Sequence, residues 1–330
     1  MTTIFHATAE QHELIESFSR PLEELFPVAR LHKDAGADAA QWLAAAELGW
    51  FGIALPEEAG GIGLSVVEEA LLFGKFGRHL VSPGFMAATL AAKLVAGDAA
   101  LARQIIAGEV TVGVARQNAD GIILFDAQDA ALVLVISEQG ATLHKAGVLT
   151  QRKTLDTAQW SITLEAAALP GNPIAQASAE AIGAGINLLI AAQLTGIAAA
   201  ALEMAVNYAQ IRQQFGVPIG SFQAIKHYCT DMAMHVQAAK DSVSFAAVAM
   251  AEGRGDYRFQ AASALVVAIR AAFFNTGKNI QIHGGMGFSA ECDAHLFLKR
   301  AHVLETLAGG LKGARAALRA EASIFAKDAA

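Results

Sequence analysis

The sequence is poor in the residues that define several classes of protein. Cys229 and Cys292 are its only cysteines among 330 residues, which excludes a disulfide framework and a cysteine-rich zinc site. Charged residues make up 17% and aromatic residues 7%, whereas 54% are hydrophobic, so a large core is expected and disorder as the main state is excluded. The net charge is −7 without a basic block, so we expect no nucleic-acid partner.

No segment has the pattern of a targeting or membrane-spanning sequence. The first residues lack the basic region and the apolar run of a signal peptide. The most apolar stretch, residues 188–202, is interrupted by Gln193 and Thr195 and is shorter than the ~20 residues that span a bilayer. We therefore expect a buried helix, no membrane partner and a location in a reducing cytoplasm.

The first part of the chain has helical periodicity, and a short middle part has the texture of strands. Apolar residues spaced three and four apart predict helices at 8–27, 37–48, 65–78 and 85–107. Short runs rich in β-branched residues predict strands at 112–115, 122–125, 131–136 and 160–164. A Pro- and Gly-containing linker at 169–173 follows.

The last part of the chain is the most regular and predicts long helices at 179–214, 220–252, 256–282 and 292–327. Long alanine-rich helices with short connections favour an antiparallel four-helix bundle. The expected fold is therefore mainly α, with three domains: an N-terminal helical domain (1–110), a reduced β domain (111–173) and a C-terminal bundle (174–330).

Two motifs stand at the ends of these long helices. In the first, Arg212 precedes Phe215, Gly216 and Pro218, and it could either complement the helix dipole or direct its planar guanidinium at a diphosphate. The second runs from Gln281 through His283-Gly284-Gly285-Met286-Gly287-Phe288. Its glycines could form a plain turn, or they could let a phosphate or a ring approach the backbone closely.

Taken together, the two motifs resemble those of the acyl-CoA dehydrogenases. The stretch 212–227 reads R-x-x-F-G-x-P-I-x-x-F-Q-x-I-x-H, and 281–288 reads Q-I-x-G-G-x-G-F. The segment Leu48–Ser65 resembles a third family stretch, so the resemblance covers residues ~40–110 and ~175–315. It implies an FAD cofactor shared across a dimer interface. Arg212 would meet its diphosphate with Phe215 nearby, and Gln281, Gly284 and Gly285 would line its adenosine and diphosphate end.

The sequence departs from the family in two places. The middle domain is about half the usual length and lacks the T-E-P-x-x-G-S-D stretch that lies near the flavin ring. The catalytic carboxylate that would remove the α-proton is also missing, because its usual position falls on Ala308 and its alternative position on Ile186 or Asn187. The nearest acids are Glu180 and Glu305, of which Glu305 is the candidate for a displaced base.

Three functions remain open after these departures. The chain could be the subunit that lacks the base in an α2β2 acyl-CoA dehydrogenase, paired with a full-length paralogue as in bacterial steroid side-chain degradation. It could instead be a self-sufficient homotetramer that uses Glu305, or a flavin-free acyl-CoA-binding or scaffolding protein. The resemblance implies an acyl-CoA substrate and an electron-transfer flavoprotein as electron acceptor. The histidines do not form a metal-binding pattern, so no metal is expected.

Overall fold

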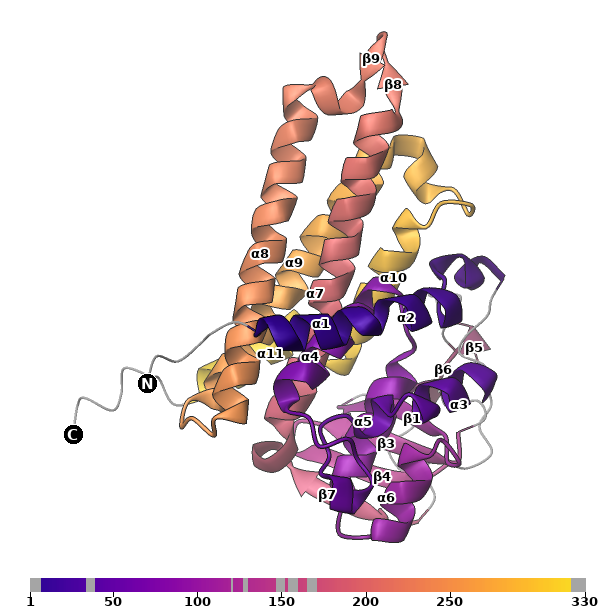
Figure 1. Cartoon of the computed structure of the whole chain (residues 1–330), viewed down its shortest axis with the longest axis vertical. Coiled ribbons are helices and arrows are strands. Elements are labelled where there is room, and N and C mark those ends of the chain that lie inside the picture. The colour runs from indigo at the N-terminus through magenta and orange to yellow at the C-terminus, as the bar shows by residue number, and fades with distance from the viewer. Residues whose placement is uncertain are drawn as a thin grey trace, which may run out of the picture.

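The computed structural model describes residues 7–33, 39–119, 121–126, 130–146, 152–153, 160–164 and 171–321, and at 152–153 and 160–164 it describes the backbone alone. The molecule has a wide body, made of the N-terminal helices and a sheet, and a helical bundle that rises from it (Figure 1). The expectation of a mainly helical fold with a small middle sheet is confirmed.

The N-terminal part is helical, as predicted, but it has more and shorter helices. These are α1 (Ala9–Ser17), α2 (Ser19–Leu25), α3 (Ala39–Glu47), α4 (Val66–Arg78), α5 (Pro83–Leu94) and α6 (Ala99–Ile106). The single helices predicted at 8–27 and 85–107 are therefore wrong. The first break lies between α1 and α2. There Pro21 has no N–H that could donate to the Ser17 carbonyl, so the helical hydrogen bond between these two residues cannot form. At the second, the Asp98 side chain accepts the Leu101 N–H and starts a new helix.

Within the described residues the middle sheet has seven strands, and the four predicted ones form in place. The strands are β1 (Val112–Asn118), β2 (Gly121–Phe125), β3 (Leu132–Ser137), β4 (Gly140–Lys145), β5 (Arg152–Lys153), β6 (Trp160–Leu164) and β7 (Ala175–Ser178). Their order is β5-β6-β2-β1-β3-β4-β7, and β1 and β3 run parallel. The strand β7 lies just beyond the predicted end of the β domain at 173; the three domain boundaries stay a prediction.

The two faces of the sheet are covered differently. Val114 and Leu134 belong to the large core that includes α5, which packs on β1 and β3. The intervening residues Ala115, Val133 and Val135 form a small cluster on the other face. This alternation follows from the twofold period of strands, and it docks the sheet onto the N-terminal helices.

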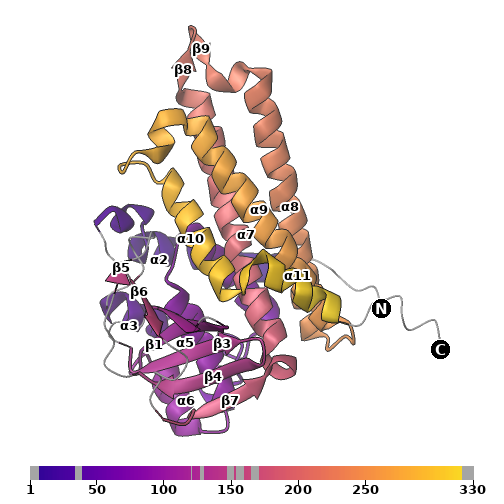
Figure 2. The same ribbon diagram turned by 180° about the vertical axis from the view of Figure 1, so that it is seen from behind.

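The bundle consists of α7 (Ala179–Ile211), α8 (Gln223–Ala251), α9 (Tyr257–His283), α10 (Ala294–Leu307) and α11 (Gly310–Ala320). The short strands β8 (Gln213–Gln214) and β9 (Val217–Pro218) form its tip (Figure 1). The prediction of one helix at 292–327 is wrong within the described residues, because Gly309 and Gly310 have φ of 80° and 75° and interrupt it. As a result α11 turns away from α10 (Figure 2).

Two bundle helices, α7 and α9, are long and apolar enough to cross a membrane by length and composition. Within their most apolar windows, 78% of the residues of α7 and 56% of those of α9 are buried inside the fold. Residues 188–199 of α7 are all buried, so the expectation of a buried helix there is confirmed.

A buried amide ties three bundle helices together. Asn275 of α9 is fully buried, and its Nδ2 donates to the carbonyl oxygens of Ala198 in α7 (3.0 Å) and Met232 in α8 (3.1 Å). Burying an amide is costly unless its hydrogen bonds are made, and within the described residues Nδ2 of this amide is paired while its Oδ1 is buried without a partner. Asn275 therefore fixes the register of α9 against both neighbours.

We expect Asn275→Ala to lower the free energy of unfolding by about 2 kcal/mol, because two buried hydrogen bonds are lost and a small cavity is left. The measurement is denaturant unfolding followed by circular dichroism. Gln237→Ala on the exposed face of α8 is the control, expected to change stability by less than about 0.5 kcal/mol. Equal stability of the two variants would contradict the prediction.

Candidate functional site

A cavity of about 550 Å³ opens at the tip of the bundle and is called here the tip cavity. The end of α7, the β8–β9 turn, the start of α8 and the turn after α9 line it. It brings together four of the residues singled out in the sequence: Arg212, Phe215, Gly284 and Gly285. Gln281 is exposed on the last turn of α9 and does not line this cavity.

Arg212 is the residue at which α7 ends. Its backbone is already extended (φ −70°, ψ 123°), while its N–H still donates to the Tyr208 carbonyl. The side chain is exposed at the wall of the tip cavity, and within the described residues its guanidinium has no hydrogen-bond or ion-pair partner. The guanidinium therefore does not cap the last carbonyls of α7, and its donors are free for a ligand.

Phe215 has an unusual backbone for a bulky residue. Its φ is 52°, in the left-handed region, and its side chain is 95% exposed. Its ring touches that of Phe222 edge to face, with centroids 6.2 Å apart. A strained backbone that presents an apolar ring to solvent gains nothing for folding, and such outliers are typical of binding sites.

The opposite wall is the turn that follows α9. Gly284 has φ of 62°, and a Cβ at Gly284 or Gly285 would meet nothing within 4 Å, so the space above this backbone is open. Beside this turn His283 stacks on Tyr208 with ring centroids 4.1 Å apart, a pairing that nothing in the sequence pattern predicts. His283 lies inside the second motif and Tyr208 lies one helical turn before the first, but only the tertiary structure places one ring on the other.

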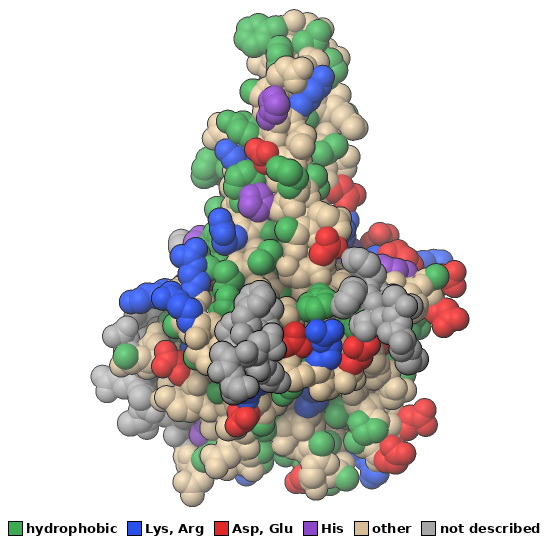
Figure 3. Space-filling view, turned by 90° about the vertical axis from the view of Figure 1, so that its left-hand side faces the viewer, with side chains coloured by type: hydrophobic (Ala, Val, Ile, Leu, Met, Phe, Trp, Pro, Cys, Tyr) green, Lys and Arg blue, Asp and Glu red, His purple; other side chains and the backbone are tan. Residues whose placement is uncertain are grey.

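Apolar side chains are exposed around the tip cavity. Ile211, Met286 and Phe288 are at least half exposed, and Phe288 reaches 78%. In Figure 3 hydrophobic side chains gather at the end of the projecting bundle. Apolar groups clustered on a projecting surface indicate a site of protein or ligand contact.

A second cavity, of about 340 Å³, lies near the opposite end of α7 and is called here the inner cavity. Ala308, Ile186 and Asn187 all line it, so the two alternative positions expected for the catalytic carboxylate meet in space. The inner cavity also contains Arg116 from β1, as well as Glu138 and Glu321, which sequence analysis did not single out. Nothing in the sequence pattern joins these segments, which the fold brings together.

Glu305 does not line the inner cavity. Its carboxylate accepts the Leu311 N–H at 3.1 Å and lies 3.8 Å from Nδ1 of His302. It borders a different cavity, on the side of α10 that faces His235 and Arg270. Glu305 thus caps the start of α11, where a carboxylate is favoured by the helix dipole. The other nearby acid, Glu180, is exposed and pairs with Arg258 at 2.8 Å.

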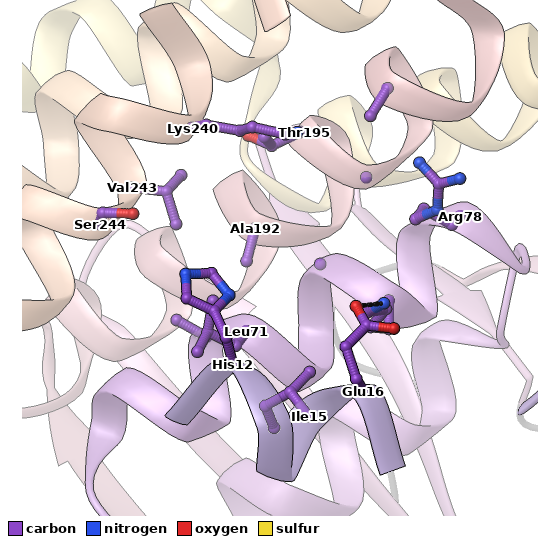
Figure 4. A pocket seen from close by; sticks show the side chains of 15 residues that line it. His12, Ile15, Glu16, Leu71, Arg78, Ala192, Thr195, Lys240, Val243 and Ser244 are labelled. Carbon is purple, nitrogen blue, oxygen red and sulfur yellow. Dashed lines mark hydrogen bonds and ion pairs between the residues drawn. The ribbon is translucent and has the colours of Figure 1, made fainter. Parts of the chain in front are cut away.

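A third cavity, of about 470 Å³, lies where α1 crosses α4, α7 and α8 (Figure 4). His12 and Ile15 point into it from α1, and Lys75 forms an ion pair with Glu16 at 2.5 Å. The hydrogen bond from Lys75 lowers the pKa of the Glu16 carboxyl. None of the predicted site residues lies in this third cavity.

Metal ligands are not grouped within the described part of the chain. No set of three or more His, Cys, Asp or Glu side chains there could hold a metal ion. The two cysteines have free thiols.

Comparison with known proteins places the chain in a family. Residues 8–105 match the pattern described as "Acyl-CoA dehydrogenase, N-terminal domain", and residues 187–319 match "Acyl-CoA dehydrogenase, C-terminal domain". Acyl-CoA dehydrogenase IpdE2 of Mycobacterium tuberculosis is 30% identical over 83% of this chain and 84% of its own length. FadE34 of the same organism is 34% identical over 80% of this chain, which spans only 39% of FadE34.

Solved structures show the same fold. The ChsE4-ChsE5 complex from Mycobacterium tuberculosis matches 97% of this chain and 100% of the compared chain, with a TM-score of 0.80 at 22% identity. The steroid enzyme Tcur3481-Tcur3483, in a G363A variant, matches 97% of this chain and 98% of the compared chain, with a TM-score of 0.78 at 24% identity. From the paired domain patterns and the similarity to IpdE2 over most of both lengths, the chain belongs to the acyl-CoA dehydrogenase family.

Proposed function

We propose that this chain is the subunit of an FAD-dependent acyl-CoA dehydrogenase that completes a partner's flavin site and lacks a catalytic carboxylate of its own. The partner would be a full-length paralogue in an α2β2 complex. One observation carries the proposal: four of the five predicted FAD contacts line one open cavity, and the expected base positions line another at the far end of α7. Asn187 and Arg212 are 25 residues apart on one helix, which is roughly 38 Å.

The tip cavity fits the outer part of FAD. The free guanidinium of Arg212 offers the planar set of donors that binds a diphosphate, and the exposed ring of Phe215 offers a face for a flat group. Open backbone at Gly284 and Gly285 lets a polar ligand approach, and Gln281 stands close by in the sequence. When bound, FAD would supply the acceptor for the substrate's hydride. This chain's residues would bind and orient it.

The inner cavity has no carboxylate at either of the two positions expected for the catalytic base. Ala308, Ile186 and Asn187 cannot take a proton, and the Glu305 carboxylate is used to cap α11 on another side of α10. The direct connection from β1 to β2, which pairs Asn118 with Gly121, leaves no room for a flavin-ring segment between them. Proton removal and the acyl-CoA pocket would therefore be supplied by the partner.

The relatives narrow the partners and substrates to test. ChsE4-ChsE5 is a complex, and Tcur3481-Tcur3483 is a steroid enzyme, so a paralogue heteromer acting on a steroid acyl-CoA is the first combination to try. An electron-transfer flavoprotein is the proposed electron acceptor, and the cytoplasm is the proposed location.

The test is flavin absorbance and mass in solution, for the chain alone and for the chain co-expressed with a full-length paralogue. The proposal expects colourless or substoichiometric protein alone and one FAD per pair of chains after co-expression. One FAD per chain in a homotetramer would instead favour the self-sufficient enzyme. Assemblies that never hold FAD would favour the acyl-CoA-binding or scaffolding protein.

We expect Glu305→Gln to change kcat of the assembled enzyme less than about twofold, since the glutamine carbonyl still accepts the Leu311 N–H. The measurement is steady-state oxidation of an acyl-CoA by the co-expressed enzyme. General-base catalysis contributes roughly 10²–10⁴-fold. A loss of that size on Glu305→Gln would identify Glu305 as a displaced base and overturn this part of the proposal.

A further inference from the structure

Arg116 is a cation that the fold places in the inner cavity without adequate partners. It projects from β1, and its Nε is buried without a hydrogen-bond acceptor. Its Nη1 reaches the Leu307 carbonyl at the end of α10 only at 3.5 Å, the outer limit for such a bond. A guanidinium has five N–H donors, so most of the hydrogen-bonding capacity of Arg116 is unused within the described residues.

The chain makes room for this side chain beside Ala308. A Cβ on Gly309 would lie 2.7 Å from Nη2 of Arg116, so the absence of a side chain at this position leaves the space that the guanidinium occupies. Gly309 also has φ of 80°, which other residues rarely adopt. The guanidinium therefore occupies space next to the position at which the family resemblance expects a carboxylate.

The other charges around the inner cavity do not neutralise Arg116. Arg258 is itself held by Glu180 at 2.8 Å and Glu321 at 3.3 Å. Glu138 is exposed at the rim and, within the described residues, makes no ion pair with Arg116. Burial lowers the pKa of Arg116, and the charge of Glu138 opposes this only in part. A half-buried cation without a contacting anion is unfavourable, and an entering anion would relieve the cost.

One part of the inner cavity wall is apolar, whereas Ser137, Asn187 and the charged residues named above form the rest. Ile136, Ile186 and Leu307 are buried where they border it, and alanines and glycines form much of the remaining wall. Its volume of about 340 Å³ falls within the ~300–1,000 Å³ of small-molecule pockets. A cation in a cavity that also has an apolar stretch of wall suits a ligand with an anionic head and a short aliphatic tail.

We infer that the inner cavity binds an aliphatic carboxylate, whose carboxyl group is held by Arg116. The inference rests on the proposed function, since it requires that no catalytic carboxylate fill the space beside Ala308. A planar carboxylate can accept two parallel N–H bonds from a guanidinium and carries the opposite charge. A neutral amide of the same shape carries no charge that could offset the charge of the guanidinium. Affinity should therefore depend on the ligand's charge and on Arg116.

The experiment is calorimetric titration of the purified full chain with sodium hexanoate and, in parallel, with neutral hexanamide. We expect one hexanoate per chain, and an affinity for hexanoate about tenfold or more above that for hexanamide. Arg116→Gln should weaken hexanoate binding by about tenfold to a hundredfold, and Arg116→Lys should weaken it less. The control Lys312→Gln removes an exposed cation on α11 outside the cavity and should leave the affinity unchanged.

Ala308→Glu is a second variant that keeps Arg116 in place. A carboxylate introduced there should pair with Arg116 and abolish hexanoate binding, while thermal unfolding shows whether each variant is folded. Equal binding of hexanoate and hexanamide, or unchanged affinity in folded Arg116→Gln, would overturn the inference. So would preferential binding of hexanoyl-CoA that is insensitive to Arg116→Gln.

The same preparations separate this inference from the proposed function. Flavin content of the co-expressed assembly tests the tip cavity, and hexanoate titration tests the inner cavity. A chain that binds hexanoate through Arg116 but never contributes to a flavin site would refute the proposed function alone. A chain that completes the partner's flavin site but does not bind hexanoate would refute this inference alone.

Discussion

Arg212→Ala is expected to lower the FAD affinity of the assembled enzyme by about tenfold to a hundredfold while leaving the assembly intact. The guanidinium is exposed at the wall of the tip cavity and has no partner within the described residues, so its removal costs the fold little. A charge-assisted hydrogen bond to a phosphate is worth roughly 1.5–3 kcal/mol, which sets the size of the loss. The measurement is flavin absorbance after dialysis, with mass in solution from light scattering.

Two further variants make this result specific to Arg212. Arg212→Lys keeps the charge but loses the planar pair of donors, so an intermediate FAD affinity is expected. Arg315→Ala removes an exposed arginine on α11 outside the tip cavity and should leave the flavin content unchanged. Full flavin content in Arg212→Ala would show that the tip cavity does not hold FAD.

Gly77→Ala is expected to lower the free energy of unfolding by about 3 kcal/mol or more. The helices α4 and α7 cross with their backbones in contact, and a Cβ on Gly77 would lie 1.9 Å from the Gln193 carbonyl oxygen. Gly196 of α7 makes the reciprocal contact, where a Cβ would lie 2.0 Å from the Gly74 oxygen. A backbone atom cannot move aside as a flexible side chain can, so α4 must shift away from the bundle.

The same helix provides the matched control. A Cβ on Gly74 would lie 3.9 Å from the nearest atom, the Ala192 oxygen, which is ordinary van der Waals contact. Gly74→Ala should therefore be neutral or stabilise by up to about 1 kcal/mol, because alanine has the higher helix propensity. Denaturant unfolding of both variants, followed by circular dichroism, checks the pair. A Gly77→Ala midpoint equal to that of Gly74→Ala would contradict the close crossing seen here.

These glycines illustrate what local patterns can miss. In the sequence, Gly74 and Gly77 look alike, as two glycines inside one predicted helix. Only the position of α7 distinguishes them, because one faces a carbonyl oxygen at a backbone crossing and the other faces the edge of the third cavity. Helical periodicity predicts which side of α4 is apolar, but it does not predict how closely another backbone approaches.

The positions at which helices end are a second feature that local sequence patterns predict incompletely. The cap at Asp98 and the glycines at 309 and 310 were visible in the sequence, yet the apolar spacing runs on through both places, so one helix was predicted at each. The strand β4 is not predicted because its residues, Gly-Ala-Thr-Leu-His-Lys, include a single β-branched side chain. Pairing with β3 and β7 stabilises this strand.

The sequence by itself determined the family, the mainly helical fold and four of the residues that line the tip cavity. These depend on short stretches such as 212–227 and 281–288, whose residues act where helices end and so are readable from local chemistry. The tertiary structure decided which of them meet. It joined Ala308 to Ile186, placed Glu305 on another side of α10, and brought Arg116 into the inner cavity. Contacts between residues more than a hundred positions apart depend on how helices and strands pack, and no local pattern encodes that packing.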